Sequence, residues 1–152
     1  MRIDFRPATP ADFDYCARLY FANMEKINRE LKLDMAAQVI SFQKQWDVTQ
    51  VRIITSDGAD IGWLQSATQD GTYFLGQLFV DAPLQGQGIG TEVMRRLINE
   101  ATRNGRTMTL GVVKINPALR LYERLGFRIV GQDERKFYMR REPAMAAKPE
   151  RS

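Results

Sequence analysis

Apolar and polar positions in the first third of the chain predict a strand followed by two helices. Alternation over residues 3–6 is typical of a short strand. Thr9 and Asp12 flank a proline in a pattern that favours a helix start, with Thr9 as N-cap and an approximate capping box. The apolar residues that then recur every three or four positions are Phe13, Ala17, Tyr20, Met24, Ile27 and Leu31. They predict one face of a helix that ends near residue 31, and a shorter helix is predicted over residues 35–46.

The middle of the chain changes to the period of a strand. Three strands are predicted over residues 51–56, 61–68 and 72–80. The sequences between them, Asp57-Gly58 and Asp70-Gly71, are strong hairpin signals. Strands joined by such short turns form an antiparallel meander.

A glycine-rich segment, residues 85–90, leads directly into a helical pattern. The apolar stripe of that helix consists of Val93, Met94, Leu97, Ile98 and Ala101, and Asn104-Gly105 closes the helix. A strand over residues 107–113 follows, so the strand–helix–strand order predicts a right-handed crossover and a parallel pair. A short helix over residues 118–125 and a final hairpin of residues 127–130 and 136–140 complete an α+β domain around one mixed, mostly antiparallel sheet flanked by helices.

Composition sets the class of protein. A chain of 152 residues, with 44% hydrophobic and 26% charged residues, is typical of one globular domain. We expect that domain over residues 1–142 and a flexible tail over residues 143–152. No apolar run approaches the roughly 18 residues of a membrane span. An acidic residue in the first six positions argues against an export signal, and a single cysteine, Cys16, favours a reducing compartment, so a cytoplasmic location is expected.

Charge and the absence of histidine exclude several functions. The 22 basic and 18 acidic residues give a net charge of +4 and a pI near 9.4. That pI is the only support for a nucleic-acid-binding domain, and no clustered basic face stands out, so no nucleic-acid partner is expected. Without histidine, catalytic triads that need it and most zinc sites are excluded, and no metal is expected.

The glycine-rich segment is the strongest chemical feature. A strand, a loop with Gly86, Gly88 and Gly90, and a helix N-terminus together favour an anion such as a pyrophosphate. A dinucleotide-binding loop would need glycine where Thr91 stands. A P-loop would need a lysine before the hydroxyl residue, and Gly90 occupies that position before Thr91. Both of these loop types are therefore excluded.

Two motifs together resemble the Gcn5-related N-acetyltransferase (GNAT) family. Gln85-x-x-Gly88-x-Gly90, after a strand that ends at Val80, resembles motif A of that family. The segment 116–127, Asn-Pro-Ala-Leu-Arg-Leu-Tyr-Glu-Arg-Leu-Gly-Phe, resembles motif B. The element order over residues 3–140 also fits the GNAT fold, so the resemblance covers nearly the whole chain.

The resemblance implies an acetyl-coenzyme A site. Loop amides would bind the pyrophosphate, while the strand ending at Val80 and residues 110–113 would splay apart, so that the pantetheine arm would follow the backbone of the first strand. A backbone N–H near Val80 would polarise the thioester carbonyl. The cofactor-binding residues implied in this way are Phe79, Val80, Gln85, Gly86, Gln87, Gly88, Ile89, Gly90, Thr91, Asn116 and Arg124.

Tyr122, in the motif B segment, is the candidate catalytic acid. A phenol, with an ordinary pKa of about 10, stays protonated at neutral pH and can protonate a departing thiolate. The alternative is a core aromatic on a short helix, and the motif favours the catalytic role. Asn116 could hold the pantetheine amide, cap the helix that follows, or do both. Arg124, with Arg120, could meet nucleotide phosphates or belong to a solvated helix face.

A protein general base and a covalent acyl-enzyme have weaker support in the sequence than the catalytic acid. Glu25, Glu30 and Asp34 are the carboxylates that could accept the amine proton, and a water chain is the alternative that we favour. The strand before motif A has no acidic residue, because Gln77 stands in a stretch where many family members have one. Cys16 lies near the apolar face of the first helix and is expected to be a core residue rather than an acyl acceptor.

The sequence therefore predicts an N-acetyltransferase that moves an acetyl group from acetyl-CoA to a primary amine by direct transfer in a ternary complex. The alternative is a non-catalytic acyl-CoA-binding regulatory module, which would have no use for Tyr122. A peptide N-terminus, a lysine side chain, a polyamine, an aminoglycoside and a small metabolite all remain open as acceptors. No membrane partner is expected, and a homodimer through the final strands is compatible with the sequence.

Overall fold

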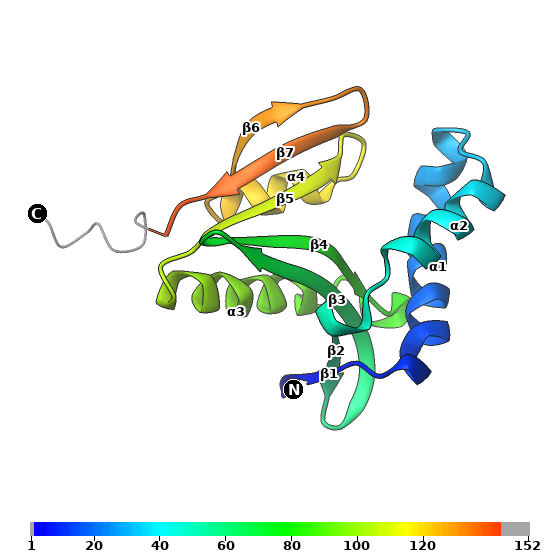
Figure 1. Ribbon diagram of the computed structural model, residues 1–152, viewed down its shortest axis with the longest axis horizontal. Helices are drawn as coiled ribbons and strands as arrows, with labels where there is room; N and C mark the ends of the chain where they lie inside the picture. Colours follow the sequence, from blue (N-terminus) through cyan, green and yellow to red (C-terminus); the bar gives the residue numbers. More distant parts are fainter. Residues whose placement is uncertain (1, 144–152) are drawn as a thin grey trace, which may run out of the picture. The chain divides into compact units, whose positions relative to one another are not determined.

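The computed structural model describes residues 2–143 (Figure 1), so most of the predicted tail lies outside the described residues. The helices are α1 (Phe13–Glu30), α2 (Met35–Gln45), α3 (Ile89–Arg103) and α4 (Ala118–Arg124). The strands are β1 (Ile3–Pro7), β2 (Val51–Ser56), β3 (Ala59–Gln69), β4 (Thr72–Val80), β5 (Thr107–Val113), β6 (Arg128–Gln132) and β7 (Lys136–Arg141). The predicted element order is confirmed, and most predicted boundaries agree within two residues.

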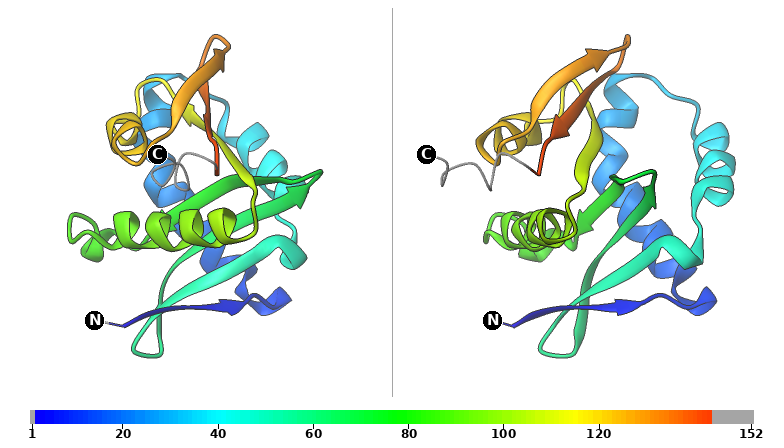
Figure 2. Two further views of the ribbon diagram at one scale, coloured as in Figure 1. Left: turned by 90° about the vertical axis from the view of Figure 1, so that its left-hand side faces the viewer. Right: turned by 60° about the vertical axis from the view of Figure 1, so that its left-hand side comes forward.

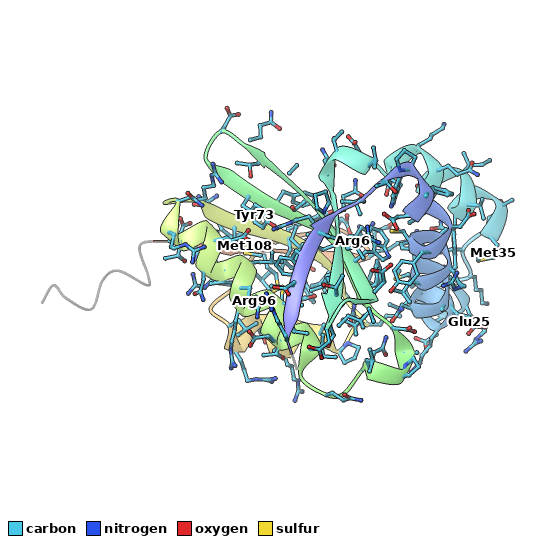
Figure 3. All side chains as sticks on the ribbon, turned by 90° about the horizontal axis from the view of Figure 1, so that it is seen from below. Arg6, Glu25, Met35, Tyr73, Arg96 and Met108 are labelled. Atoms are coloured by element: carbon cyan, nitrogen blue, oxygen red, sulfur yellow. The ribbon has the colours of Figure 1, made fainter. Side chains whose placement is uncertain are left out.

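Seven strands form one sheet in the order β1-β2-β3-β4-β5-β7-β6. The pairs β1–β2, β2–β3, β5–β7 and β6–β7 are antiparallel. The pair β4–β5 is parallel, and Tyr73 is the register partner of Met108 (both labelled in Figure 3). The mixed sheet with one parallel pair and four helices confirms the predicted fold class.

The two turns predicted from Asp-Gly sequences have the backbone that such sequences favour. Asp57 and Gly58 have φ values of 51° and 88°, and Asp70 and Gly71 have 52° and 77°. Positive φ at both central residues is the mark of a type I′ hairpin turn, which matches the twist of the strands that it joins. The turn sequence therefore accounts for the pairing of β2 with β3 next to the turn, and the register shifts once between Ile54 and Thr55.

By its contacts the chain forms two compact units, which are described separately. Unit 1 consists of Met1–Gln65 and Gln77–Gly90, and unit 2 of Ser66–Gly76 and Thr91–Ser152. Unit 1 includes α1, α2, β1 and β2, and unit 2 includes β5, α4 and the β6–β7 hairpin, which is orange and red in Figure 2. The single domain expected over residues 1–142 stays a prediction.

The core of unit 1 combines buried aliphatic residues with a cluster of aromatic rings. Trp63 on β3 is fully buried and packs edge-on against Phe42 of α2, with ring centroids 6.0 Å apart. On α1 the predicted apolar face is offset from the buried one, because the fully buried residues are Cys16, Leu19 and Asn28. Residues of the predicted face such as Tyr20 are only half-buried. The ring of Tyr20 packs on the ring of Phe42 in α2. The burial of Cys16 confirms that it is a core residue.

An ion cluster ties three segments of unit 1 together. The Arg6 guanidinium donates to both carboxylate oxygens of Asp12, each at 3.0 Å, and to Asp60 at 2.9 Å. The Asp12 carboxylate also accepts the backbone N–H of Thr9 at 2.9 Å, which completes the predicted helix start. Hydrogen bonds from Arg6 hold the pKa of Asp12 below its ordinary value. β1, the first helical turn and β3 are therefore fastened at one point.

The core of unit 2 is mainly aliphatic. The five residues of the predicted α3 stripe are all buried, and Met108, Leu110 and Val112 of β5 are buried as well. Gly105 ends α3 with a φ of 66°, and the N–H of Arg106 returns to the carbonyl of Ala101. The stripe and the glycine stop predicted from the sequence are confirmed.

Candidate active site

The loop between β4 and α3 has an open, left-handed backbone at two glycines. Gly86 and Gly88 have φ values of 83° and 81°, a region that glycine enters without steric cost. A Cβ built at Gly86, Gly88 or Gly90 would meet no atom within 4 Å. The protein itself therefore leaves the space beside the loop free, as a backbone that must approach a ligand requires.

The loop also presents unused hydrogen-bond donors. Within residues 2–143, the backbone N–H groups of Gly86, Gln87 and Gly88 meet no acceptor. The first N–H groups of α3, which starts at Ile89, have no partner inside the helix. Ile89 is buried and so anchors the helix at its first residue. Successive free N–H groups at a helix N-terminus favour an anion, so these residues fit the pyrophosphate of acetyl-CoA.

The end of β4 is held very close to β3. A Cβ at Gly62 would lie 2.3 Å from the Phe79 carbonyl oxygen, and the Asp81 N–H donates to the Ile61 carbonyl at 2.8 Å. The alternation of buried and exposed residues along β4 holds up to Gly76 and is lost beyond it. The parallel register with β5 extends only as far as Leu75. β4 therefore stops pairing with β5 before Phe79 and Val80, the residues that the family resemblance assigned to the pantetheine arm.

The side chain of Gln85 makes bonds within the protein. Its Nε2 donates to the Val80 carbonyl at 2.8 Å and to Oδ1 of Asn23, and its backbone N–H donates to the Ala82 carbonyl. The implied contact of Gln85 with the cofactor stays a prediction, and the structure shows how its side-chain amide hydrogens are used without a ligand. Phe79 packs on Tyr20 and Trp63, with ring centroids 5.4 and 5.5 Å apart.

Tyr122 lies in unit 2 on α4. Its ring packs against Phe127 with centroids 6.1 Å apart, and burial raises its pKa above the ordinary value of a phenol. Among the described residues, none forms a hydrogen bond with the Tyr122 hydroxyl. The phenol is therefore protonated at neutral pH and its hydroxyl is uncommitted, as the catalytic acid predicted from the sequence requires.

The other motif B residues have distinct environments. Asn116 Oδ1 accepts the N–H of Ala118 at 2.9 Å, so the capping role is observed and the Nδ2 donors remain for another partner. Arg124 is exposed on α4, as is Arg120. The binding roles of Asn116 and Arg124 stay predictions.

The candidate bases are engaged elsewhere or exposed. Glu25 pairs with Arg29 at 3.8 Å on the surface of α1, and Glu30 pairs with Lys26 at 3.9 Å. Asp34 caps α2, because its carboxylate accepts the N–H of Ala36 at 3.1 Å.

Burial raises the pKa of the Cys16 thiol to about 11 and leaves it protonated at neutral pH. A protonated, buried thiol makes a poor nucleophile, so Cys16 does not favour a covalent acyl-enzyme.

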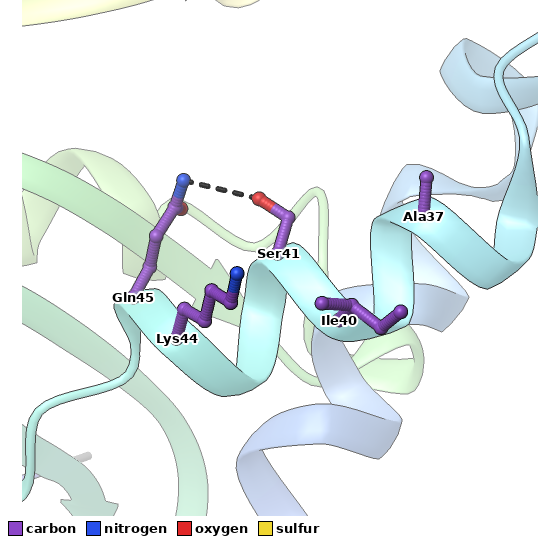
Figure 4. A pocket seen from close by; sticks show the side chains of 5 residues that line it. All are labelled: Ala37, Ile40, Ser41, Lys44 and Gln45. Atoms are coloured by element: carbon purple, nitrogen blue, oxygen red, sulfur yellow. Dashed lines mark hydrogen bonds between the residues drawn. The ribbon is translucent and has the colours of Figure 1, made fainter.

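A separate hollow lies on α2 (Figure 4). It is lined by Ala37, Ile40, Ser41, Lys44 and Gln45, and Gln45 donates to Ser41 at 3.2 Å. None of these residues was predicted as a site residue. In the described part of the chain, no helix is long and apolar enough to cross a membrane, and no three metal-ligating side chains converge.

Family comparison identifies the class of protein. The family model of the acetyltransferase (GNAT) domain matches residues 47–129, more than half of the chain. The chain belongs to the GNAT acetyltransferases, which confirms the resemblance found in the sequence. Acetyl transfer that depends on acyl-CoA, with acetyl-CoA as cosubstrate, follows from this membership. No curated protein matches this sequence.

Solved structures share the fold at low identity. One is the PaiA N-acetyltransferase from Thermoplasma acidophilum in complex with coenzyme A, with 15% identity and a TM-score of 0.67 over 93% of this chain and 99% of that chain. Another is the ribosomal-protein-S18-alanine N-acetyltransferase from Escherichia coli, with 19% identity and a TM-score of 0.66 over 93% and 94%. At such identities the comparison shows the fold alone.

Two residues of the site region were missed in the sequence. Gly62 stands inside a predicted strand, and a glycine at such a position is a known sign of close backbone approach, so this signal was present. Asn23 stands among the polar residues of an amphipathic helix, and nothing in its local pattern marks its contact with Gln85.

Proposed function

We propose that this protein is an N-acetyltransferase that transfers the acetyl group of acetyl-CoA directly to a primary amine, with the Gly86–Gly90 loop as the pyrophosphate site. The observation that carries the proposal is the row of unpaired N–H groups at Gly86, Gln87 and Gly88, continued by the start of α3. Ile89, Gly90 and Thr91 supply the helical part of this row. The loop has no basic side chain, so the donors are backbone dipoles.

Backbone groups near the end of β4 would orient the thioester. When bound, acetyl-CoA supplies an activated carbonyl and a thiol leaving group. Phe79 and Val80 would align the pantetheine arm through their backbone, and an N–H near Val80 would stabilise negative charge on the carbonyl oxygen. The bond that Gln85 makes to the Val80 carbonyl and the close approach at Gly62 support a fixed backbone here.

Tyr122 would donate a proton to the departing thiolate. Its raised pKa keeps the proton in place until a thiolate forms, and its hydroxyl has no competing partner among the described residues. Asn116 would donate from Nδ2 to a pantetheine carbonyl while Oδ1 caps α4. Arg124 would meet a nucleotide phosphate from its exposed position.

Water, rather than a carboxylate, would take the proton of the amine. Glu25 and Glu30 are paired with neighbouring cations on α1, and Asp34 is a helix cap. Direct transfer is supported by the burial of Cys16. A homodimer through the final strands would use β6, an edge strand on which Ile129 and Val130 are exposed.

The acceptor is a primary amine on a peptide or a small molecule. The structural neighbour from Escherichia coli acts on the alanine of ribosomal protein S18, which supports a peptide N-terminus as the first acceptor to test. The first assay should therefore include a peptide amine, a lysine side chain, a polyamine and an aminoglycoside.

The test is release of the coenzyme A thiol from acetyl-CoA in the presence of each amine, for wild type and Tyr122→Phe. Loss of a general acid should lower turnover about 100-fold or more while the Kd for coenzyme A stays within twofold. Tyr138→Phe is a matched control, because its hydroxyl binds Asp133 at 2.6 Å in the final hairpin. Full activity of Tyr122→Phe would show that Tyr122 is not the catalytic acid, and no thiol release by the wild type with any amine would favour the non-catalytic acyl-CoA-binding module.

A further inference from the structure

Two side-chain amides in unit 1 join α1 to the loop between β4 and α3, which is the proposed pyrophosphate site. Asn23 Nδ2 donates to the Leu19 carbonyl at 2.8 Å, one turn back along α1. Asn23 Oδ1 then accepts from Gln85 Nε2, across 62 residues of sequence. The same Nε2 donates its second hydrogen to the Val80 carbonyl at 2.8 Å. One amide group of Gln85 thus bridges a helix and the last residue of β4.

The orientation of both amides follows from their partners. Because Asn23 uses its nitrogen on Leu19, only its oxygen is left for the neighbouring side chain. Gln85 must therefore present nitrogen, since it faces two oxygen acceptors. A residue that offers only oxygen at position 85 would repel both acceptors. The arrangement accordingly requires a side chain that donates hydrogen bonds at position 85.

The bridge spans the segment that leads from the end of β4 into the loop. Val80 ends β4 and Gln85 directly precedes Gly86, and between them the short turn Ala82–Leu84 is closed by the Gln85 N–H on the Ala82 carbonyl. The Gln85 side chain ties the two ends of this segment together and to the middle of α1.

We propose that Asn23 and Gln85 are positioning residues that couple the loop to α1, so that coenzyme A bound at Gly86–Gly90 also restrains α1. This inference rests on the proposed role of the loop. α1 carries Glu25 and Glu30, two of the carboxylates considered as the general base, so the coupling would make this helix respond to the nucleotide. Neither residue touches the reacting atoms in this account.

A matched control exists directly after the C-terminal end of α3. Asn104 Nδ2 donates to the Glu100 carbonyl at 2.8 Å, the same bond one turn back as that of Asn23. Asn104 Oδ1 accepts no hydrogen bond within the described residues. Asn104→Ala therefore removes the local bond alone, whereas Asn23→Ala removes both the local bond and the bridge.

The first measurement is the Kd for coenzyme A by calorimetry for Asn23→Ala, Gln85→Ala, the double variant and Asn104→Ala. Loss of one hydrogen bond should weaken binding by about fivefold in each bridge variant. The double variant should bind no more weakly than Gln85→Ala, because both changes break the same link. Asn104→Ala should stay within twofold. Losses that multiply in the double variant would overturn the coupling.

The second measurement is amide hydrogen exchange with and without saturating coenzyme A. In the wild type, the ligand should slow exchange both in the loop and around Asn23. In Asn23→Ala the loop should stay protected while α1 loses its ligand-dependent protection. Asn23→Asp keeps an oxygen acceptor for Gln85 although it loses the bond to Leu19, so part of the protection should return, which a general loss of helix stability would not allow.

The outcomes separate this inference from the proposed function. Coenzyme A that binds the wild type and protects the loop but leaves α1 unchanged would overturn the coupling alone. No binding by the wild type would overturn the loop assignment, and the coupling with it. Equal α1 protection in wild type and Asn23→Ala would show that the bridge does not transmit the restraint.

Discussion

Unit 1 and unit 2 differ in the aromatic rings that pack around their cores and in their charge. Unit 1 holds both tryptophans and nine of the fifteen aromatic residues, and many of these rings are half-buried and gather around Phe42. The buried residues are mainly aliphatic in both units, and the buried methionines lie in unit 2. Unit 1 has eight basic and ten acidic residues, and unit 2 has fourteen and eight. The basic excess therefore lies outside the unit that contains the loop, so the anion binding proposed for the loop would depend on backbone donors.

The units also differ in how well they satisfy buried polar atoms. In unit 1 the Tyr15 hydroxyl, the Trp63 indole nitrogen and both amide atoms of Asn28 are buried without a partner. In the described part of unit 2 no such atom occurs. Each unpaired buried group costs on the order of 1–3 kcal/mol. Unit 1 therefore retains polar groups that its stability does not require, whereas unit 2 resembles an ordinary core.

The largest difference should come from two strand glycines. In Gly62→Ala the new Cβ would meet the Phe79 carbonyl at 2.3 Å, so backbone must move, at a cost of about 3 kcal/mol or more. In Gly111→Ala of unit 2 the nearest atom is a Tyr138 ring carbon at 3.4 Å, and the cost should stay within about 0.5 kcal/mol. Urea unfolding measures both. Equal costs would mean that the close approach at β4 is not a constraint.

An intermediate effect should follow from breaking the ion cluster of unit 1. Arg6→Ala leaves the half-buried Asp12 carboxylate without its two guanidinium bonds and should cost about 1–2 kcal/mol at neutral pH. Because the folded pKa of Asp12 is lowered, this contribution is present above the ordinary carboxylate pKa of about 4 and is lost as the pH falls through the folded value.

The control in unit 2 is Arg128→Ala, which removes an exposed pair with Glu142 at 3.7 Å. Its cost should be well below that of Arg6→Ala at neutral pH, because solvent screens this longer pair. Unfolding of wild type and both variants at several pH values between 2 and 7 makes the comparison. A cost of Arg6→Ala that persists below pH 3 would contradict the ionic origin of the effect.

A stabilising change should be available in unit 1. Asn28→Leu replaces a buried, unpaired amide by an apolar side chain of similar size and should raise the free energy of unfolding by about 1 kcal/mol. Thermal unfolding provides the measurement. A loss of stability would show that the Asn28 amide has a partner, such as ordered water, that stabilises the fold.

The smallest effect should appear at alkaline pH. The folded pKa of Cys16 is raised from 9.0 to about 11, so the unfolded chain ionises first and stability falls between these values. The loss should be about 1 kcal/mol at pH 10. Cys16→Ala should be less stable at pH 7 and should show a flatter pH dependence of unfolding. The same pH dependence of unfolding in wild type and Cys16→Ala would mean that another group, for instance Tyr15 or Tyr20, causes the loss of stability at alkaline pH.

Local features of the fold were predictable from the sequence, and long-range contacts were not. The turns at Asp57-Gly58 and Asp70-Gly71 and the loop glycines were found because their residue types determine their backbone conformation. The Asn23–Gln85 bridge joins residues 62 positions apart, and no periodicity encodes such a contact. On α1 the buried face was predicted slightly off, since half-buried rings and a buried Asn28 do not follow a simple apolar stripe.

The most direct test is thermal unfolding with and without coenzyme A for wild type, Gly88→Asp and Gly71→Asp. Both glycines have a positive φ and open space at Cβ, so the two substitutions bring similar strain, and only Gly88 lies in the loop. Coenzyme A at 100 times its Kd should stabilise wild type and Gly71→Asp by about 2.7 kcal/mol, a rise of several degrees, and should leave Gly88→Asp unchanged. NAD and ATP should give no comparable shift. A wild type that does not respond to saturating coenzyme A, or a Gly88→Asp variant that responds fully, would contradict the assignment of the loop.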